Sequence, residues 1–478
     1  MHAVLALGLG VDHGPAFWIL LTSDVLTFTS VPSVLRRRRG RPISALAWLL
    51  ALFGLPFVGV GFWWLLARTR LERPLRYRVA AVERVCSACP PLASSPRELS
   101  PRLAAVTPFA LSGARVREGV FPPARVEEAE LLVDGGDFFA AVEAAIGRAT
   151  AEVRVQIYIW RDDPTGRRLA EALAAKAREG VRVHVLVDAV GTGVFRLRRR
   201  LTSAGVRVAS FHPLRLELGL PAFQLRNHRK LFWIDGSTAF VGGMNVGQEY
   251  AREWHDLGVR FRGPVVHHLG EVFREDWAFA TGKELDIPSP PHADSAGDVA
   301  VVIAGGPDRV RPRIEDAIVM ACGAAESRAW VLTPYFIPTE PVRSALRTAA
   351  LRGVDVRLVV PARGDVRLAA LAARPFYREL IDDGVQVLEY QDRVLHAKAI
   401  LIDDDLTLLG SVNLDERSMR LNFELLVCTA SAALAEQLEA VFVDDMPRCR
   451  ALTREELLAE SRWSQLAESV AHLLSPLL

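Results

Sequence analysis

One polar pattern, His-x-Lys-x-x-x-x-Asp, occurs twice in this chain and continues without a gap to an Asn and then a carboxylate. The first copy is His228, Lys230, Asp235, Asn245 and Asp256, and the second is His396, Lys398, Asp403, Asn413 and Glu424. All five positions keep the same spacing in the two copies. Two ungapped copies of one polar set indicate two homologous halves, each giving a His and a Lys to a shared site.

Lysine usage sets these positions apart from the rest of the chain. Only four Lys occur among 58 basic residues, and two of them, Lys230 and Lys398, belong to the repeated motif. An ammonium is a compact, strongly hydrated point charge, whereas a guanidinium is a planar fork. Because Arg has replaced Lys almost everywhere else, we expect these two positions to require Lys itself.

The larger part of the chain alternates strand-like and helix-like segments. Val153 to Trp160 is rich in β-branched and aromatic residues, and Leu169 to Glu179 has the periodicity of an amphipathic helix. The second half repeats this order, with strands at Trp330 to Ile337 and Val354 to Val360 around a helix at Val342 to Leu351. The alternation predicts an α/β fold in which a mixed sheet flanked by helices is duplicated about a pseudo-twofold axis.

Two apolar segments near the N-terminus predict a membrane anchor. Ile43 to Leu66 runs 24 residues without a charge, long enough to cross a bilayer as a helix. Pro15 to Leu35 is its expected partner, although it contains Asp24. Arg36 to Arg39 lie in the short link, where they would set the topology of a transmembrane helical hairpin or attract anionic lipid. A secretory signal peptide is disfavoured because the strongest apolar segment is internal and too long.

These features divide the chain into four parts. We expect a membrane anchor of two apolar helices at residues 1–70, and a Pro-, Ser- and Ala-rich linker at residues 71–124. The first α/β half then covers residues 125–290, and the second covers residues 291–478.

Composition argues against several classes of protein. A formal net charge of +2 over 478 residues does not indicate a wholesale nucleic-acid binder. The five Cys are too scattered for a disulfide framework, and Cys86 with Cys89 makes only a weak zinc site. No His-Glu-x-x-His pattern and no glycine-rich phosphate loop accompany the repeated motif. We therefore expect no metal ion, no other cofactor and no nucleic-acid partner.

Backbone alternation predicts where the motif side chains point. Residues two apart in a strand share a face, so His228 and Lys230 would point together, as would the second pair. Asp235 opens an Asp-Gly hairpin turn, and Asp403 opens an acidic turn. These two aspartates complete the candidate catalytic motif, but we expect them to shape the site from behind rather than to touch a substrate.

The other repeated residues suggest the chemistry. Asp256 and Glu424 are the expected carboxylates that hold each imidazole in one tautomer. Two Lys and two Asn, with Ser411, supply donors for oxygens that share negative charge, as a phosphodiester does. One His would attack phosphorus to form a phosphohistidine, and the other would protonate the leaving alkoxide and then deprotonate the incoming hydroxyl. The supporting residues are Asn245, Asp256, Ser411, Asn413 and Glu424.

Longer segments around these residues resemble the bacterial cardiolipin synthases of the phospholipase D superfamily. Besides the paired apolar segments, they are Asn227-His-Arg-Lys230, Trp254-His-Asp256, Thr333-Pro-Tyr-Phe-Ile-Pro338, Leu395-His-Ala-Lys398, Leu421-Asn-Phe-Glu424 and Ser475-Pro-Leu-Leu478. The resemblance implies a phospholipase D-like fold on the bacterial inner membrane, crossing it more than once. It also implies a reaction in which two phosphatidylglycerols give cardiolipin and glycerol. By the same resemblance His228 would take the phosphatidyl group and His396 would be the acid-base, although near symmetry leaves the reverse assignment open.

Related functions stay open from the sequence. A phospholipase D-type hydrolase would use the same residues with water as the acceptor, and another phosphatidyltransferase would use a different alcohol. A nuclease of the superfamily would show a basic groove and need no spanning helices. A membrane scaffold with a decayed site is disfavoured because His, Lys, Asp and Asn are intact in both copies. The expected partners are phosphatidylglycerol and membrane lipids.

Overall fold

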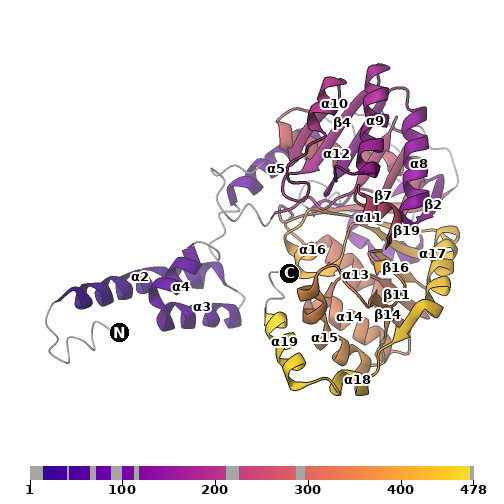
Figure 1. The fold of residues 1–478 in the computed structure, drawn as a ribbon. Helices are drawn as coiled ribbons and strands as arrows, with labels where there is room; N and C mark the ends of the chain where they lie inside the picture. The colour runs from indigo at the N-terminus through magenta and orange to yellow at the C-terminus, as the bar shows by residue number, and fades with distance from the viewer. Residues whose placement is uncertain are drawn as a thin grey trace. The chain divides into compact units, whose positions relative to one another are not determined.

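The computed structural model describes residues 14–39, 42–64, 72–87, 99–111, 118–211, 225–286 and 297–473 (Figure 1). The chain divides into two compact units, Met1–Pro74 with Arg215–Phe223 and Leu75–Leu214 with Gln224–Leu478. Several features of the sequence lie outside the described residues: the end of the second apolar segment, Cys89 and Ser475 to Leu478. The side chain of Cys86 is also not described.

The small unit holds the apolar helices. Among the described residues, α2 (Pro15–Arg37) is the one helix long and apolar enough to cross a membrane, over Phe17–Arg37. The second apolar segment differs from the uninterrupted helix expected, because it forms α3 (Pro42–Gly54) and α4 (Pro56–Phe62). A proline has no N–H to donate and its ring clashes with the preceding turn, so the helix is interrupted just before Pro56.

Within this unit α2 packs against the two shorter helices. Trp64 Nε1 donates to Ser30 Oγ at 2.9 Å, and Thr27 Oγ1 donates to the Leu52 carbonyl oxygen at 3.3 Å. These bonds satisfy polar groups that an apolar surrounding would otherwise leave unpaired. The small buried cluster between the helices consists of Val34, Leu52, Val60 and Trp63.

The large unit contains two mixed sheets with the same strand order. The first sheet runs β2 (Glu128–Val133), β9 (Leu257–Arg262), β7 (Thr238–Gly242), β6 (Leu231–Ile234), β3 (Glu152–Ile157), β4 (Arg182–Asp188) and β5 (Arg207–Phe211). The second runs β1 (Ala124–Val126), β10 (Asp298–Gly305), β19 (Glu424–Ala430), β17 (Leu406–Gly410), β16 (Ala399–Ile402), β11 (Arg328–Leu332), β13 (Asp355–Pro361), β14 (Gln386–Tyr390) and β20 (Cys449–Ala451). Without its edge strands β1 and β20, the second sheet repeats the first strand for strand. The predicted duplicated mixed sheet is confirmed.

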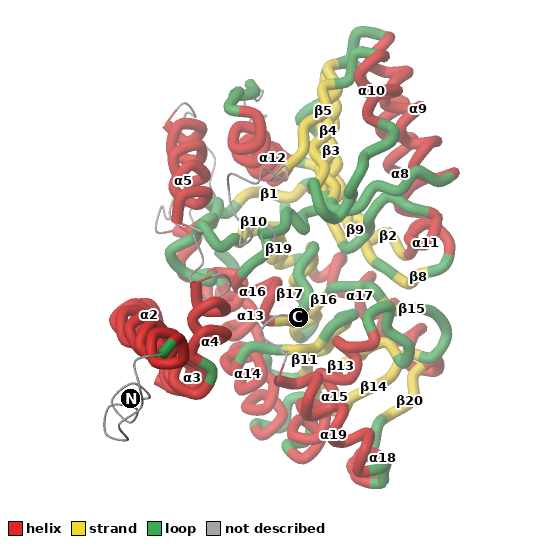
Figure 2. The backbone as a smooth tube through the Cα atoms, turned by 60° about the vertical axis from the view of Figure 1, so that its left-hand side comes forward, coloured by secondary structure: helices red, strands yellow, loops and turns green. Residues whose placement is uncertain are grey.

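Helices cover both faces of each sheet (Figure 2). In the first half α8 (Asp134–Arg148), α9 (Pro164–Arg178) and α10 (Arg198–Ser203) lie on one face, and α12 (Val265–Thr281) lies on the other. The second half repeats them as α13 (Arg313–Ala324), α14 (Glu340–Leu351), α15 (Arg367–Asp382) and α17 (Ala432–Asp445). Further helices are α5 (Glu72–Ser87), α6 (Pro101–Val106), η2 (Pro108–Leu111), α11 (Gln248–Arg252), α16 (Glu416–Arg420), η5 (Met446–Arg448), α18 (Arg454–Leu458) and α19 (Arg462–Leu473).

Two details of the sheets differ from the sequence-based expectation. The segment Trp330 to Ile337 was expected to be one strand, but it is divided into β11 and β12 (Phe336–Ile337). Pro334 lies between them and cannot donate a hydrogen bond to a central ladder. In addition, β1 pairs with β10, so the chain contributes a strand to the second sheet before it builds the first.

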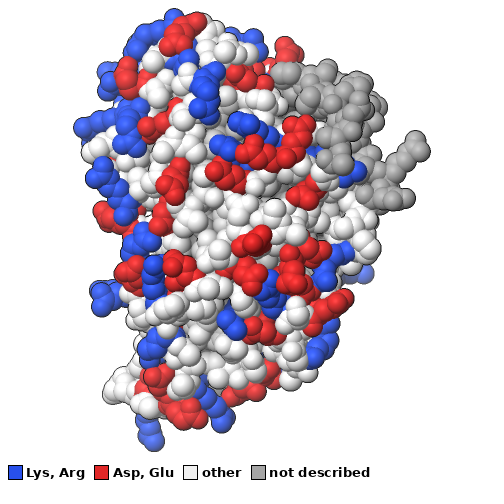
Figure 3. Space-filling view, turned by 90° about the vertical axis from the view of Figure 1, so that its right-hand side faces the viewer, with Lys and Arg blue, Asp and Glu red and all other residues white. Residues whose placement is uncertain are grey.

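The face of the molecule in Figure 3 carries Lys and Arg side chains interspersed with Asp and Glu. Basic side chains do not gather into one stripe on that face. Mixed charge of this kind is typical of a solvated surface.

Two glycines at equivalent positions of the two sheets leave no room for a side chain. A Cβ on Gly242 would meet the Leu257 carbonyl oxygen, and a Cβ on Gly410 would meet the equivalent oxygen of Leu425. Because the backbone cannot yield easily, Gly242→Ala and Gly410→Ala should each lower the free energy of unfolding by about 1–3 kcal/mol. Thermal unfolding in detergent measures this. Gly323→Ala, in α13 with open space around it, is the control and should unfold no earlier than the natural protein.

Candidate active site

The repeated His and Lys lie just before a strand rather than within it. β6 begins at Leu231 and β16 begins at Ala399, one residue after each motif Lys. The backbone is nevertheless close to extended, and Lys230 Nζ donates to the His228 carbonyl oxygen at 2.7 Å. Lys398 Nζ donates to the His396 carbonyl oxygen in the same way. All four side chains are buried.

Each imidazole is held by a carboxylate from the other half. His228 Nδ1 lies 3.0 Å from Glu424 Oε1, and His396 Nδ1 lies 2.6 Å from Asp256 Oδ2. The sequence predicted these two carboxylates as orienting groups. It did not predict the exchange, which makes each histidine depend on the opposite half.

Backbone pairing between the halves produces this exchange. The His228 N–H donates to the Phe423 carbonyl oxygen at 2.9 Å, and the His396 N–H donates to that of His255 at 2.7 Å. The second contact continues a short parallel pairing of β8 (Trp254–His255) with β15 (Val394–Leu395). The residue just before each orienting carboxylate therefore holds the backbone of the histidine that this carboxylate contacts.

Further polar groups hold the two carboxylates. Ser411 Oγ donates to Glu424 Oε2, and Asn422 Nδ2 donates to Glu424 Oε1 at 3.1 Å. Asp256 Oδ1 accepts the Leu257 N–H at 2.8 Å. Ser411, expected to be a phosphate donor, is thus bonded to the carboxylate that orients His228.

The two motif asparagines are bonded to their own surroundings. Asn245 Oδ1 accepts the Ile159 N–H at 3.1 Å, and the Asn245 side chain also bonds Tyr250. The Asn413 side chain bonds that of Asp415. Their expected role as donors to a phosphodiester stays a prediction.

Asp235 and Asp403 lie at the far ends of β6 and β16 and brace turns. Asp235 accepts N–H groups from Ala151 and Glu152 at 2.9 and 2.7 Å, and Asp403 accepts those of Ser327 and Arg328 at 2.7 and 2.9 Å. Both aspartates have a positive φ, 51° and 49°. Backbone hydrogen bonds outweigh burial and lower the pKa of Asp403 to about 2. Each aspartate joins its motif strand to the neighbouring strand of the same sheet.

Aromatic side chains line the two histidines. The Tyr158 ring lies edge-on to His228 with centroids 4.9 Å apart. Trp254 and Tyr250 lie 4.9 and 5.6 Å from the His396 ring. Sequence reasoning did not single out Tyr158, whose one signal was an aromatic residue at the end of a buried strand.

Burial is the main influence on the ionisation of the histidines. It lowers the pKa of His228, an effect that Glu424 opposes and Lys230 reinforces. It lowers the pKa of His396 likewise, with Lys398 reinforcing the effect and Asp256 opposing it. Both imidazoles are therefore neutral at pH 7 in the free protein, and each Nδ1–H donates to its carboxylate.

The lysines and Glu424 are shifted by the same surroundings. Burial lowers the pKa of Lys230 well below its usual range and also lowers that of Lys398, against the pull of nearby carboxylates. Burial alone would raise the pKa of Glu424, but His228, Lys230 and Ser411 outweigh it and lower that pKa. Among the described residues, no group of three His, Cys, Asp or Glu side chains is placed to hold a metal ion.

Comparison with known proteins identifies the family. A family model described as "Cardiolipin synthase, PLD-like domain" matches residues 142–277 and 318–446, the two halves that carry the motifs. Cardiolipin synthase A of Pseudomonas aeruginosa (strain LESB58) is 36% identical over 471 residues, which cover 96% of each protein. The chain belongs to the cardiolipin synthase family.

Other relatives agree with this assignment. A cardiolipin synthase of Geobacillus kaustophilus (strain HTA426) is 33% identical over 498 residues, covering 100% of this chain and 97% of the relative. The crystal structure of a phosphatidylserine synthase from Haemophilus influenzae Rd KW20 superposes with a TM-score of 0.59 at 16% identity. It covers 78% of this chain and 100% of that one, and supports the phospholipase D-like fold.

In this cardiolipin synthase family member, His255 fastens the two halves rather than lining the site. His255 Nδ1 lies 2.7 Å from Asp134 Oδ1, in the first half, and Nε2 lies 2.9 Å from Asp445 Oδ2, in the second. Arg393 Nη2 donates to Asp134 Oδ2 at 2.8 Å. Burial alone would lower the pKa of His255, but the two aspartates outweigh it and raise that pKa to about 9.

This contact predicts an alkaline loss of stability. Because the folded pKa of about 9 exceeds the ordinary 6.5, the imidazolium stabilises the fold fully below about pH 6.5, and the contribution is lost as pH rises through about 9. Its size is on the order of 3 kcal/mol. His255→Gln should therefore flatten the fall in melting temperature between pH 7 and pH 9.5. An unchanged slope in the variant would contradict the role of this imidazolium.

Proposed function

We propose that this protein is a membrane-bound phosphatidyltransferase that joins two phosphatidylglycerols into cardiolipin and releases glycerol. The observation that carries the proposal is the exchange of orienting carboxylates, which gives one site two equivalently held histidines. A displacement in two steps needs such a pair, one as nucleophile and one as acid-base. The relatives named cardiolipin synthase along nearly the whole chain support the choice of substrate.

Charge balance favours an anionic phosphodiester in this site. When both lysines are protonated, their two positive charges balance the two carboxylates, so neutral histidines leave these six side chains without net charge. A bound phosphodiester adds one negative charge, which favours uptake of a proton by one imidazole. Substrate binding would thus create the acid that the first step needs, while the other imidazole stays neutral.

The chemistry then proceeds in two displacements. His228 Nε2 forms a bond to phosphorus, the bond to the glycerol oxygen breaks, and the protonated His396 gives its proton to that oxygen. His396, now neutral, takes a proton from the hydroxyl of a second phosphatidylglycerol, whose oxygen displaces His228 from phosphorus. Lys230 and Lys398 would stabilise the charge on the equatorial oxygens. The assignment of the two histidines follows the family resemblance.

The membrane part of the proposal rests on the small unit. α2 would cross the membrane, and α3 with α4 would return through it, which makes the protein a multi-pass protein of the bacterial inner membrane. The anchor of residues 1–70 and the linker of residues 71–124 would keep the two halves beside lipid substrates. Both reactants are then concentrated in the plane where the site works.

Product analysis tests the proposed function. Purified protein would be incubated in mixed micelles with phosphatidylglycerol labelled in its headgroup, with a chelator present, and the lipids would be separated. We expect cardiolipin with matched release of glycerol. Phosphatidic acid as the sole product would identify a hydrolase, and the absence of turnover would reject the proposal. His228→Ala and His396→Ala should each abolish turnover, whereas near-full activity in either would reject the two-histidine mechanism.

Replacing the orienting carboxylates tests the exchange between halves. Glu424→Gln and Asp256→Asn keep the side-chain shape but stabilise an imidazolium less and permit the wrong tautomer. We expect kcat to fall on the order of 10²-fold or more in each. Glu436→Gln, on the exposed side of α17, is the control and should keep the natural rate. A Glu424→Gln variant with the natural kcat would show that His228 does not depend on its partner.

A further inference from the structure

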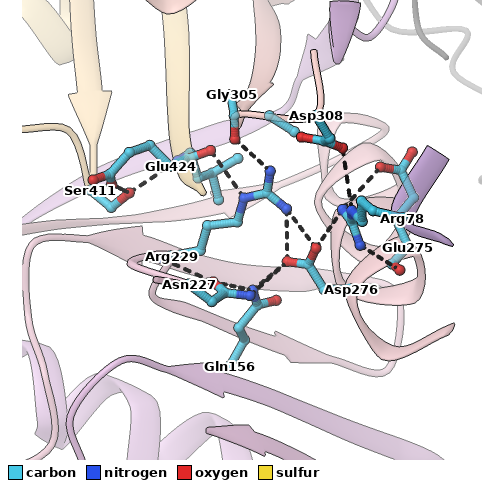
Figure 4. A network of polar contacts seen from close by, with 12 residues as sticks. Arg78, Gln156, Asn227, Arg229, Glu275, Asp276, Gly305, Asp308, Ser411 and Glu424 are labelled. Atoms are coloured by element: carbon cyan, nitrogen blue, oxygen red, sulfur yellow. Dashed lines mark hydrogen bonds and ion pairs between the residues drawn. The ribbon is translucent and has the colours of Figure 1, made fainter. Parts of the chain in front are cut away.

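A cluster of buried charges lies behind the first motif (Figure 4). The side chains in it are 0–2% exposed, and their contacts pair three guanidinium groups with three carboxylates. Charges buried this deeply persist only where they are paired. The members are Arg78, Arg229, Glu275, Asp276, Asp308 and Arg309.

Arg78 enters this cluster from outside the duplicated halves. It lies on α5, which precedes both segments matched by the family model and runs beside α12 in Figures 1 and 2. Its Nη1 donates to the Glu275 carbonyl oxygen at 2.7 Å, and its Nε donates to Asp308 Oδ2 at 3.4 Å. Its Nη2 forms an ion pair with Asp276. The Arg78 side chain thus contacts three groups outside α5: the Glu275 carbonyl oxygen and the carboxylates of Asp276 and Asp308.

Asp276 transmits this contact to the motif. Its two oxygens accept bonds from Arg229 Nη1 at 2.8 and 2.7 Å, and Oδ2 also accepts from Asn227 Nδ2 at 3.2 Å. Asn227 and Arg229 flank His228, so their side chains point away from it along the extended backbone. Asp276 therefore holds the reverse face of the segment whose front face carries His228 and Lys230.

Arg229 bonds that segment to the backbone of Glu424, the residue whose carboxylate contacts His228. Its Nε donates to the Glu424 carbonyl oxygen at 3.0 Å, and its Nη2 donates to that of Gly305 at 2.9 Å. A planar guanidinium can make these bonds together with its bonds to Asp276 because its donors have a fixed geometry. One side chain thus fixes His228 relative to Glu424, the pair that the first half-site uses.

Within the part of the chain that the structure describes, the second half-site has no such group of paired charges. The motif spacing places Leu395 and Ala397 where the first copy has Asn227 and Arg229, and neither side chain carries a charge. The equivalent strand contact is secured instead by His255 between Asp134 and Asp445. Among the described residues, the half-site of His228 is therefore the one that contacts α5, the helix that follows the apolar segments.

We propose that Arg78 is a positioning residue of the first half-site, holding the His228–Glu424 pair in place through Asp276 and Arg229. It supplies the third positive charge of the cluster. Without it three carboxylates face two guanidinium groups, and Asp276 is no longer held in the position that engages Arg229. The α5 helix is then part of the working site as well as a connection to the apolar segments. This inference rests on the proposed phosphatidyl transfer.

Steady-state kinetics of the full-length protein tests the proposal, with phosphatidylglycerol in mixed micelles. Arg78→Ala should lower kcat about tenfold or more and leave KM within about twofold, because the reacting groups are misplaced while lipid binding is kept. Arg78→Lys should recover part of the loss. The control is Arg84→Ala, on the exposed side of the same helix, which should keep the natural kcat.

Thermal unfolding separates positioning from a purely structural role. If Arg78→Ala melts earlier but keeps the natural kcat at a temperature well below its melting point, the proposal is wrong. If Arg78→Ala does not fold, the conservative variants Arg78→Lys and Arg229→Lys form a double-mutant cycle. The double variant should lose less kcat than the product of the two single losses, and independent losses would overturn the coupling. If the natural protein transfers no phosphatidyl group, the proposed function is rejected. If the natural protein is active and the Arg78 variants keep its kcat, only the role proposed for Arg78 is rejected.

Discussion

The whole arrangement depends on two histidines that take their orienting carboxylates from the opposite half. Neither half holds its own imidazole, because each histidine bonds the opposite half twice: His228 contacts Phe423 and Glu424, and His396 contacts His255 and Asp256. The two sheets must therefore meet in one register before either histidine is oriented. Duplication alone would give two incomplete sites, and the exchange makes one complete site from them.

Burial sets the ionisation state of the histidines in this exchange. The carboxylates are fully buried, and the imidazoles are neutral because burial outweighs the attraction of those carboxylates. In a buried site an incoming phosphodiester changes the balance of charge strongly, since each charge is poorly screened by solvent.

The two half-sites are alike in the carboxylates that hold their histidines, but they differ in the groups that hold the backbone of each histidine segment. The first half-site is fastened by guanidinium and carboxylate groups that reach α5, whereas the second is fastened by one imidazolium between two aspartates. The two half-sites are thus held by chemically different groups. The proposed reaction needs one neutral and one protonated imidazole, and different surroundings would favour such a division between two similar histidines.

The sequence by itself determined the duplication, the two motif histidines and lysines, the orienting carboxylates and the mixed sheets, because equal spacing and alternating hydrophobicity are local properties of the chain. It also indicated that Asp235 and Asp403 shape turns, since Asp235 begins an Asp-Gly pair and Asp403 begins a run of three aspartates. It did not show that the second apolar segment is interrupted at Pro56 or that Trp330 to Ile337 is two strands. Only the tertiary structure decided which carboxylate meets which histidine, and it alone placed Arg78 and His255 in the contacts that support the site from behind. Those contacts join residues 121 to 230 positions apart, and no local pattern records which distant surfaces meet when two sheets pack.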